Sequence, residues 1–261
     1  MKVDSVKPSI EQDRDMSQRA TVLEDLYKGY FGSQENCRYF VEHIPQDFLS
    51  VSNPKVLDAG SSLGTVGKYV CRELSGQGIT PQLILLDTNE EILKKSLDTL
   101  YKIVANLKQI PLADSSMNII LLRSVLHYEP TLEAQEAILK EIYRVLAPGG
   151  VFISQFGSFK DDDEAQAFNR LFKFLKRDVG FVSKDTGVKM HADVFDEIYK
   201  ITEGPSLEEN VDEFSARVGK DISGEVGDYI SGHQSELKNI LVNNNPITWR
   251  VGFTIVSCRK K

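Results

Sequence analysis

The chain lacks the features that mark several large protein classes. Its three cysteines, Cys37, Cys71 and Cys258, lie far apart and form no Cys-x-x-Cys pair. This spacing argues against a zinc site or a disulfide framework and is typical of reduced thiols in a cytoplasmic protein. No apolar run is long enough to span a bilayer, and the N-terminal segment has no apolar signal core. We therefore expect a cytoplasmic protein without a membrane span.

An excess of positive charge is also missing. The chain has 31 Lys and Arg against 38 Asp and Glu, which gives a formal net charge of −7. Because basic patches supply affinity for nucleic acids, this balance argues against a general nucleic-acid-binding surface. An apolar content of 41% is ordinary for a globular protein, and 261 residues suffice for one large domain or for one domain with a sizeable insertion.

Short apolar runs alternate with amphipathic helical patterns between Lys55 and Phe156. The expected strands cover about 55–58, 82–87, 102–106, 117–124 and 151–156. The expected helices cover about 65–74, 88–100 and 132–146; the second opens with a capping box at Thr88–Glu91, and the third stops at Pro148–Gly150. Continuous apolar strands are buried on both faces, so we predict a doubly wound α/β fold with a mostly parallel sheet.

The alternation stops on both sides of this core. Residues 1–49 are predicted to form an N-terminal helical cap, and residues 50–158 the α/β core. Residues 159–243 are predicted to be a helical insertion, with helices over about 161–176 and 207–218, the latter opened by a capping box at Ser206–Glu209. Residues 244–261 are expected to return to the core sheet as strand. The insertion is a candidate lid or substrate-recognition cover, and a scaffold or dimer surface is nearly as good an interpretation, so a homodimer is a candidate assembly.

The segment Lys55–Gly64, with the sequence KVLDAGSSLG, is the strongest functional signal in the chain. Asp58 ends an apolar strand, glycines follow, and a helical pattern resumes at Thr65. A strand, a tight glycine turn and a helix start allow bare main-chain N–H groups to approach a ligand. Asp87 and Asn106 end other predicted strands, and the carboxyl ends of parallel strands meet at one edge of a sheet. We therefore predict a site for a nucleotide-like cofactor at that edge.

Four motifs resemble, in order and spacing, those of the class I S-adenosylmethionine-dependent methyltransferases, in particular their small-molecule branch. They are VLDAGSSLG, LLDTN, ANLKQIPLADSSMNIILL and RVLAPGGVFIS. The resemblance covers about Lys55–Phe156 and the C-terminal strand. It implies a Rossmann-like methyltransferase fold with a seven-stranded sheet, and S-adenosyl-L-methionine as cofactor. It also implies methyl transfer to a small molecule or a carrier-bound intermediate, and it implies no metal.

The resemblance assigns the amino-acid and ribose ends of the cofactor to the first two motifs. Asp58, Gly60 and Ser61 would carry the amino-acid end. Asp87 would accept hydrogen bonds from the two ribose hydroxyls. Singly, an aspartate at a strand end more often caps a loop. Two of them on adjacent strand ends favour a ligand.

The third motif is similar to the segment that holds adenine in this family. Asn106 and Leu107 fall where the adenine contacts lie, although an acidic residue is usual at the position of Asn106. A turn residue and a core residue are equally good interpretations of this pair. The other cofactor candidates lie beside the positions already named: Ser62, which replaces a glycine of the family pattern, Gly64, Thr88 and Arg123.

His127 is the candidate catalytic base. It lies in SVLHYEP, directly after the strand predicted over 117–124 and therefore at the rim of the expected cofactor site. Histidine titrates near neutral pH and can accept a proton from an acceptor group without unusual tuning. A histidine that shapes the pocket or bonds locally is an equal alternative.

Gly60–Gly64 also fits the pattern G-x-S-x-G of a hydrolase nucleophile elbow. Ser62 would then be the nucleophile, with Asp193 or Asp212 and His233 following in the chain order of that family. The helical pattern before residue 50 argues against this hypothesis, because a hydrolase elbow normally follows several strands. A non-catalytic relative that binds only the cofactor or a partner protein is a third hypothesis.

Overall fold

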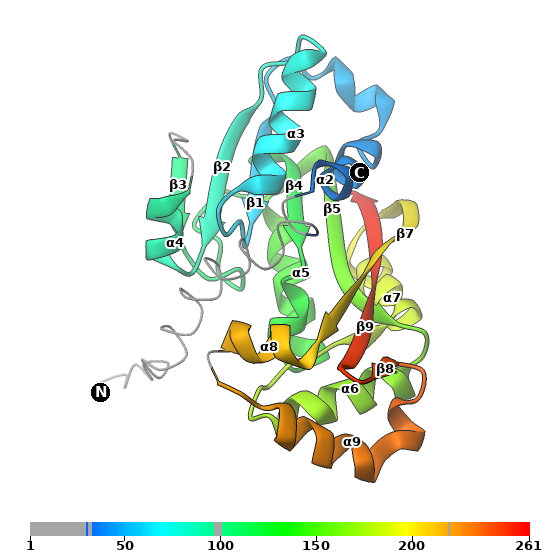
Figure 1. Ribbon diagram of the computed structural model, residues 1–261. Helices are drawn as coiled ribbons and strands as arrows, with labels where there is room; N and C mark the ends of the chain where they lie inside the picture. The colour runs from blue at the N-terminus through cyan, green and yellow to red at the C-terminus, as the bar shows by residue number, and fades with distance from the viewer. Residues whose placement is uncertain (1–29, 31–32, 97–100, 219) are drawn as a thin grey trace, which may run out of the picture.

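The computed structural model describes residues 30, 33–96, 101–218 and 220–261 (Figure 1). Most of the predicted N-terminal cap, and the end of the helix predicted over 88–100, lie outside these ranges. Within them, none of the helices is both long and apolar enough to cross a membrane.

A mixed sheet forms the centre of the described structure. Its main path runs in the order β3-β2-β1-β4-β5-β9-β7 (Figure 1). These strands are β1 (Lys55–Ala59), β2 (Gln82–Asp87), β3 (Tyr101–Val104), β4 (Met117–Arg123), β5 (Leu146–Phe159), β7 (Glu197–Asn210) and β9 (Ile247–Arg259). The first five pair in parallel, and β9 lies antiparallel to both β5 and β7. The predicted doubly wound, mostly parallel fold is confirmed.

Two short strands and a set of helices complete the fold. The short strands are β6 (Val182–Ser183), on β5, and β8 (Leu241–Asn244), on β9. The α-helices are α2 (Gln34–Glu42), α3 (Thr65–Gly76), α4 (Glu90–Lys95), α5 (Leu132–Val145), α6 (Asp162–Phe174), α7 (Lys184–Val194), α8 (Val211–Val218) and α9 (Ser223–Leu237). Among the described residues, the 3₁₀ turn η1 (Gln46–Ser50) lies between α2 and β1, and the 3₁₀ turn η2 (Leu126–Tyr128) lies between β4 and α5.

Side chains of the central strands alternate between two helical layers. Ile119 and Leu121 of β4 belong to the core that includes α2 and α3, whereas Ile120 and Leu122 belong to the core of α5 and α7. Successive side chains of a strand point to opposite faces, so a run of apolar residues satisfies both layers at once. This alternation explains why β4 has no polar residue between Ile119 and Leu122.

A third apolar cluster lies at one end of the sheet. There, Figure 1 shows α6, α8 and α9 near the end of β5 and the start of β9. Phe168 of α6, Phe214 of α8 and Trp249 of β9 are buried there, and the indole ring of Trp249 contacts both phenyl rings. Helices α8 and α9 precede the last two strands, β8 and β9.

The predicted insertion over 159–243 nevertheless contains a strand of the main sheet. β7 pairs with β9 along almost its whole length, from Glu197 to Asn210. The capping box predicted at Ser206–Glu209 is wrong, because these residues belong to the strand. The capping box lies at Asn210–Glu213, at the start of α8. Asn210 Oδ1 accepts from Glu213 N at 2.9 Å, and Glu213 Oε2 accepts from Asn210 N at 3.0 Å.

Two other helix boundaries differ from the predictions. Asn89, not Thr88, caps α4, since its side chain accepts from Ile92 N at 3.1 Å. Helix α5 ends at Val145, before Pro148–Gly150, and β5 begins at once. The Pro-Gly-Gly segment forms an irregular start of β5, where Gly149 has φ +75° and donates its N–H to Lys260 O at 2.8 Å.

Candidate functional site

The turn between β1 and α3 has an unusual backbone. Gly60, Ser62 and Gly64 all have left-handed φ values, +66°, +49° and +78°. The glycines are also sterically required, because a Cβ at Gly60 would lie 2.5 Å from Val125 Cγ2 and one at Gly64 would lie 2.9 Å from Leu85 Cδ1. At these two glycines, the main chain of the turn therefore packs closely against β2 and against the segment after β4.

Asp58 lies almost fully buried at the end of β1. Its Oδ2 accepts a hydrogen bond from Gly67 N at 2.9 Å, within the first turn of α3. Burial raises the pKa of this carboxyl to about 7, against the opposing effects of the Gly67 N–H and the Arg123 guanidinium. One oxygen of Asp58 thus connects α3 to β1. This is a structural role, and the sequence allowed both a structural role and a binding role for this residue.

Asp87 connects two other segments at the end of β2. Its Oδ2 accepts from Ser62 N at 2.9 Å, and its Oδ1 accepts from Asn89 N at 3.0 Å. Its main-chain oxygen accepts from Ala105 N at 3.1 Å. Each carboxylate oxygen can accept a further bond, so these contacts leave acceptor capacity for hydroxyl groups of a ligand.

The segment after β3 is where the adenine contacts are predicted. Asn106 is exposed, and its Oδ1 accepts from Lys108 N at 2.8 Å in an Asx turn. Leu107 is 6% exposed and belongs to the core shared with α5, so the core interpretation holds for its side chain. Lys108 Nζ lies 2.9 Å from a carboxylate oxygen of Glu129, beyond η2.

These contacts join four segments in a closed ring. The turn 60–64 touches the segment 125–129 through Gly60, and it bonds to Asp87 through Ser62. Asp87 bonds to the segment 105–108, which returns to the segment 125–129 through the Lys108–Glu129 ion pair. The structure therefore brings together, at the carboxyl ends of β1 to β4, the segments from which the candidate residues were predicted.

Two smaller candidates lie on this ring. Ser61 is 7% exposed, and its hydroxyl has no hydrogen-bond partner among the described residues. A buried hydroxyl without a partner is costly, and a ligand group at the turn would satisfy it. Thr88 is exposed beside Asp87.

Arg123 lies on the face of the sheet covered by α2. It is the register partner of Gln155 on β5, and its Nη1 lies 3.8 Å from Cys37 Sγ of α2. Its guanidinium opposes the rise in the pKa of both Asp58 and Cys37, which burial causes. Arg123 therefore acts on the site mainly through its charge, from one side of the four joined segments.

Gln155 is a polar residue that the sequence prediction missed. It is 2% exposed, its Nε2 donates to the Tyr30 hydroxyl at 3.4 Å, and its Oε1 has no partner among the described residues. The Tyr30 hydroxyl in turn donates to Pro205 O at 2.7 Å, which fixes the start of the described chain to β7. The signal was present in the sequence, because Gln155 interrupts the apolar run of VFISQF.

His127 lies in η2, two residues beyond Val125. Its ring stacks on Phe181 with a centroid distance of 4.4 Å and an interplanar angle of 9°. The ring centroids of His127 and Tyr128 lie 4.3 Å apart. Its main-chain oxygen accepts from Gly180 N at 2.8 Å. The imidazole is thus held in a fixed orientation next to the ring of segments.

The hydrolase hypothesis finds no support in the described contacts. His233 Nδ1 is paired with Tyr229 O at 2.8 Å, and its ring stacks on Tyr229 at 4.1 Å. Asp193 forms an ion pair with Lys189 on α7, and Asp212 accepts from the Ser223 hydroxyl at the start of α9. Within the described part of the chain, these interactions lead to Tyr229, Lys189 and Ser223 and not to Ser62.

Comparison with known proteins decides the family of this α/β core. Residues 57–154 match the model of a family described as a methyltransferase domain. The matched part of the core is a methyltransferase domain. The matched region contains the glycine turn, Asp87 and the segment after β4.

Two curated relatives and one solved structure are similar to this chain. Over 132 residues it is 34% identical to the ubiquinone/menaquinone biosynthesis C-methyltransferase UbiE of Rickettsia typhi, covering 47% of this chain and 50% of that protein. Over 147 residues it is 26% identical to the carboxy-S-adenosyl-L-methionine synthase of Shewanella frigidimarina, covering 52% and 58%. The YcgJ protein from Bacillus subtilis has the same fold, with a TM-score of 0.69, 15% identity, and 88% and 99% coverage. The chain spans about half the length of the curated relatives it matches.

Proposed function

We propose that this chain is an S-adenosylmethionine-dependent methyltransferase that acts on a small molecule or on a carrier-bound intermediate. The observation that carries the proposal is the position of Asp87, which bonds to the glycine turn through Ser62 and to the segment 105–108 through Ala105. An adenosyl amino acid needs these three surfaces together, one each for its amino-acid end, its ribose and its adenine. The methyltransferase-domain match covers the same segments.

Each residue of the ring has a proposed role in binding. Asp87 accepts hydrogen bonds from the ribose hydroxyls, and Asn106 contacts the adenine. The turn and its flanks bind the amino-acid end, where the ammonium lies near Asp58 and the carboxylate meets main-chain N–H groups. The other candidates complete this surface: Gly60, Ser61, Ser62, Gly64, Thr88, Leu107 and Arg123. Leu107 contributes by holding the segment to the core, and Arg123 contributes charge.

Bound S-adenosylmethionine supplies a methyl group on a positively charged sulfur. A lone pair of the acceptor attacks the methyl carbon, the carbon–sulfur bond breaks, and its electron pair stays on the sulfur of S-adenosylhomocysteine. The protein contributes mainly alignment of the acceptor, since the reaction is an in-line displacement. His127, held by its stacking on Phe181, is positioned to take the proton that the acceptor loses.

The curated relatives support a small-molecule acceptor. One is named for C-methylation in quinone biosynthesis and the other for the synthesis of carboxy-S-adenosyl-L-methionine, a modified form of the cofactor itself. The second name suggests an alternative for this chain, in which the cofactor is altered and no acceptor receives a methyl group. Cytoplasmic location, a homodimer and the lack of a nucleic-acid partner are further expectations of the proposal.

Mass spectrometry of the purified full chain incubated with S-adenosylmethionine and a panel of small-molecule acceptors tests the proposal. We expect S-adenosylhomocysteine to form together with an acceptor that is heavier by one methyl group. A modified S-adenosylmethionine without S-adenosylhomocysteine would favour the alternative. Calorimetric titration with S-adenosylhomocysteine tests binding alone, and absence of binding would contradict the proposal.

A further inference from the structure

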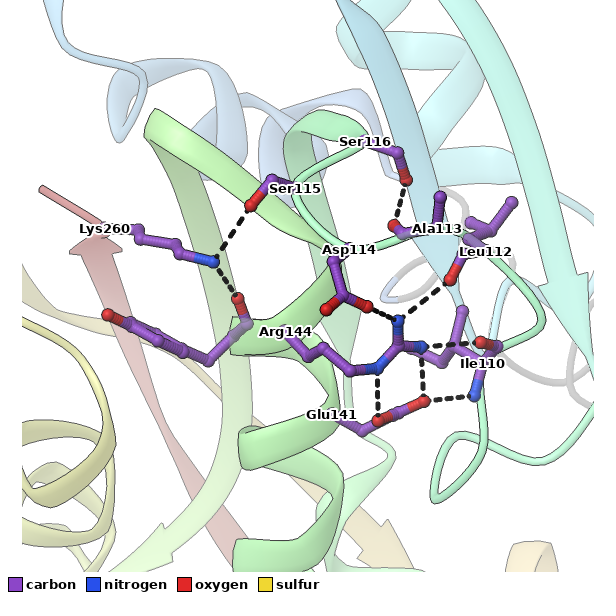
Figure 2. A network of polar contacts seen from close by, with 10 residues as sticks. Ile110, Leu112, Ala113, Asp114, Ser115, Ser116, Glu141, Arg144 and Lys260 are labelled. Carbon is purple, nitrogen blue, oxygen red and sulfur yellow. Dashed lines mark hydrogen bonds and ion pairs between the residues drawn. The ribbon is translucent and has the colours of Figure 1, made fainter.

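The segment between β3 and β4 is fastened to α5 by one arginine (Figure 2). Arg144 Nη2 donates to Ile110 O at 2.8 Å, and Arg144 Nη1 donates to Leu112 O at 3.0 Å. The same guanidinium forms ion pairs with Asp114 at 2.5 Å and with Glu141 at 2.7 Å. Glu141 Oε1 also accepts from Ile110 N at 2.8 Å, so both main-chain groups of Ile110 are held.

The shape of the guanidinium matters here as much as its charge. Its Nε and both Nη atoms all donate to partners of this cluster, which Figure 2 shows converging on one side chain. A lysine carries the same charge on a single nitrogen and cannot span two main-chain oxygens and a bidentate carboxylate. The guanidinium also holds the pKa of Glu141 below its usual value, so the pair is ionised near neutral pH.

Both ends of the segment have other anchors. At its start, Ala105 N bonds to Asp87 O at 3.1 Å. At its end, Ser115 N bonds to Arg144 O at 2.9 Å, and Lys260 Nζ lies 3.4 Å from Ser115 Oγ. The stretch around Ile110 lies between these anchors.

The side chain of Ile110 is 2% exposed and belongs to the apolar core shared with α5, whereas the main chain around it borders a hollow. A hollow of about 630 Å³ lies between the segment and α5, and its lining includes Asn106, Gln109, Pro111 and Arg144. Beside this hollow, the polar contacts of Arg144 and Glu141 hold the main chain of the segment, in addition to the packing of Ile110. Asn106, the candidate adenine residue, lies on the rim of the same hollow.

We propose that Arg144 and Glu141 are positioning residues for the cofactor, which hold residues 105–112 in the conformation that receives the adenine. This inference rests on the proposed function. Neither residue needs to touch the ligand. Without the arginine contacts, residues 109–112 would sample more conformations, and binding would have to order them at a cost in affinity.

Calorimetric titration of the full chain with S-adenosylhomocysteine tests this inference, with Arg144→Gln and Arg144→Lys as the variants. We expect Arg144→Gln to weaken binding about tenfold, and Arg144→Lys to weaken it nearly as much, because lysine cannot hold both main-chain oxygens. Arg170→Gln is the matched control: Arg170 pairs with Glu236 between α6 and α9, and it is half exposed. Its affinity should stay at that of the unaltered protein.

Hydrogen exchange on the same proteins reports the segment directly. In Arg144→Gln without ligand, the amides of Ile110 and Leu112 should exchange faster, and saturating S-adenosylhomocysteine should restore their protection. Circular dichroism checks that each variant is folded. If Arg144→Gln does not fold, Glu141→Gln replaces it, with about a threefold loss of affinity, since glutamine keeps an acceptor for Ile110 N but loses the ion pair.

The outcomes separate this inference from the proposed function. Unchanged affinity in folded Arg144→Gln, or full affinity in Arg144→Lys, would overturn the positioning role while leaving the proposed function intact. Unchanged affinity in folded Glu141→Gln, where that variant is used, would overturn it in the same way. No binding of S-adenosylhomocysteine by the unaltered protein would overturn both.

Discussion

The main-chain N–H of Ser62 donates a hydrogen bond to a carboxylate oxygen of Asp87 at 2.9 Å. This bond connects the turn after β1 with the end of β2, and Ser62 adopts a left-handed backbone, φ +49°, at the point where it forms. The residue that replaces a family glycine therefore keeps the backbone shape of a glycine. Substitutions at Asp87 and at Ser62 test the acceptor and the backbone conformation separately.

Asp87→Ala should weaken S-adenosylhomocysteine binding by a few kcal/mol, because it removes the partner of the ribose hydroxyls and leaves Ser62 N–H without its acceptor. Isothermal titration calorimetry measures the change. Asp87→Asn is the control, since its amide oxygen can still accept from one donor, and it should lose less. Equal affinity of Asp87→Ala and the unaltered protein would remove Asp87 from the binding site.

Ser62→Gly should stabilise the fold by roughly 0.5–1 kcal/mol, because glycine adopts a left-handed backbone without the steric penalty of a Cβ. Urea denaturation gives the free energy of unfolding. Ser62→Ala keeps the Cβ and should show no gain. The same glycine variant should retain S-adenosylhomocysteine binding, and loss of binding would show that the hydroxyl contacts the ligand.

Asp58→Asn should change how stability depends on pH. The folded pKa of Asp58 is about 7, above the ordinary 3.8, because the carboxyl is buried. Between these values the unfolded chain ionises while the folded protein keeps the proton. The stability contributed by Asp58 is therefore full below about pH 4 and is lost as the pH rises through about 7.

The measurement is the free energy of unfolding of both proteins at several pH values between 4 and 8. The advantage of the unaltered protein over Asp58→Asn should shrink toward high pH by up to a few kcal/mol. Burial lowers the pKa of His191 to about 4, which gives the opposite pH dependence, but this residue is present in both proteins and cancels. A difference that stays constant with pH would contradict the raised pKa.

His127→Phe should lower the rate of methyl transfer by about 10²-fold or more while S-adenosylhomocysteine affinity stays nearly unchanged. Phenylalanine can keep the stacking on Phe181 but cannot take a proton. Single-turnover rates with an acceptor identified by the mass-spectrometric screen measure the effect. His127→Ala, which also loses the stacking, separates packing from chemistry. A rate equal to that of the unaltered protein in His127→Phe would make His127 a structural residue.

Much of the candidate site was predictable because its signals are local. The glycines of the turn are required by positive φ values and by close neighbours, and both follow from a strand, a turn and a helix within ten residues. Asp58 and Asp87 could be placed at one edge because parallel strands bring their carboxyl ends together. Leu107 could not be assigned, since a leucine after a strand suits the core and a ligand equally well.

The contacts that join these elements depend on residues far apart in the chain. Gln155 and Arg123 become register partners only when β4 and β5 pair. Arg144 holds Ile110 across 34 positions, and no periodicity in either segment indicates that bond.

The sequence by itself determined the doubly wound core, because buried strands and amphipathic helices carry their own periodicities of apolar residues. The tertiary structure alone decided that β7 belongs to the sheet. β7 lies at the end of the main path, and many of its side chains alternate between exposed and partly buried positions, so its mixed polar pattern resembles that of a capped helix. A strand with one face open to solvent needs no continuous apolar run, and only its pairing with a distant segment identifies it.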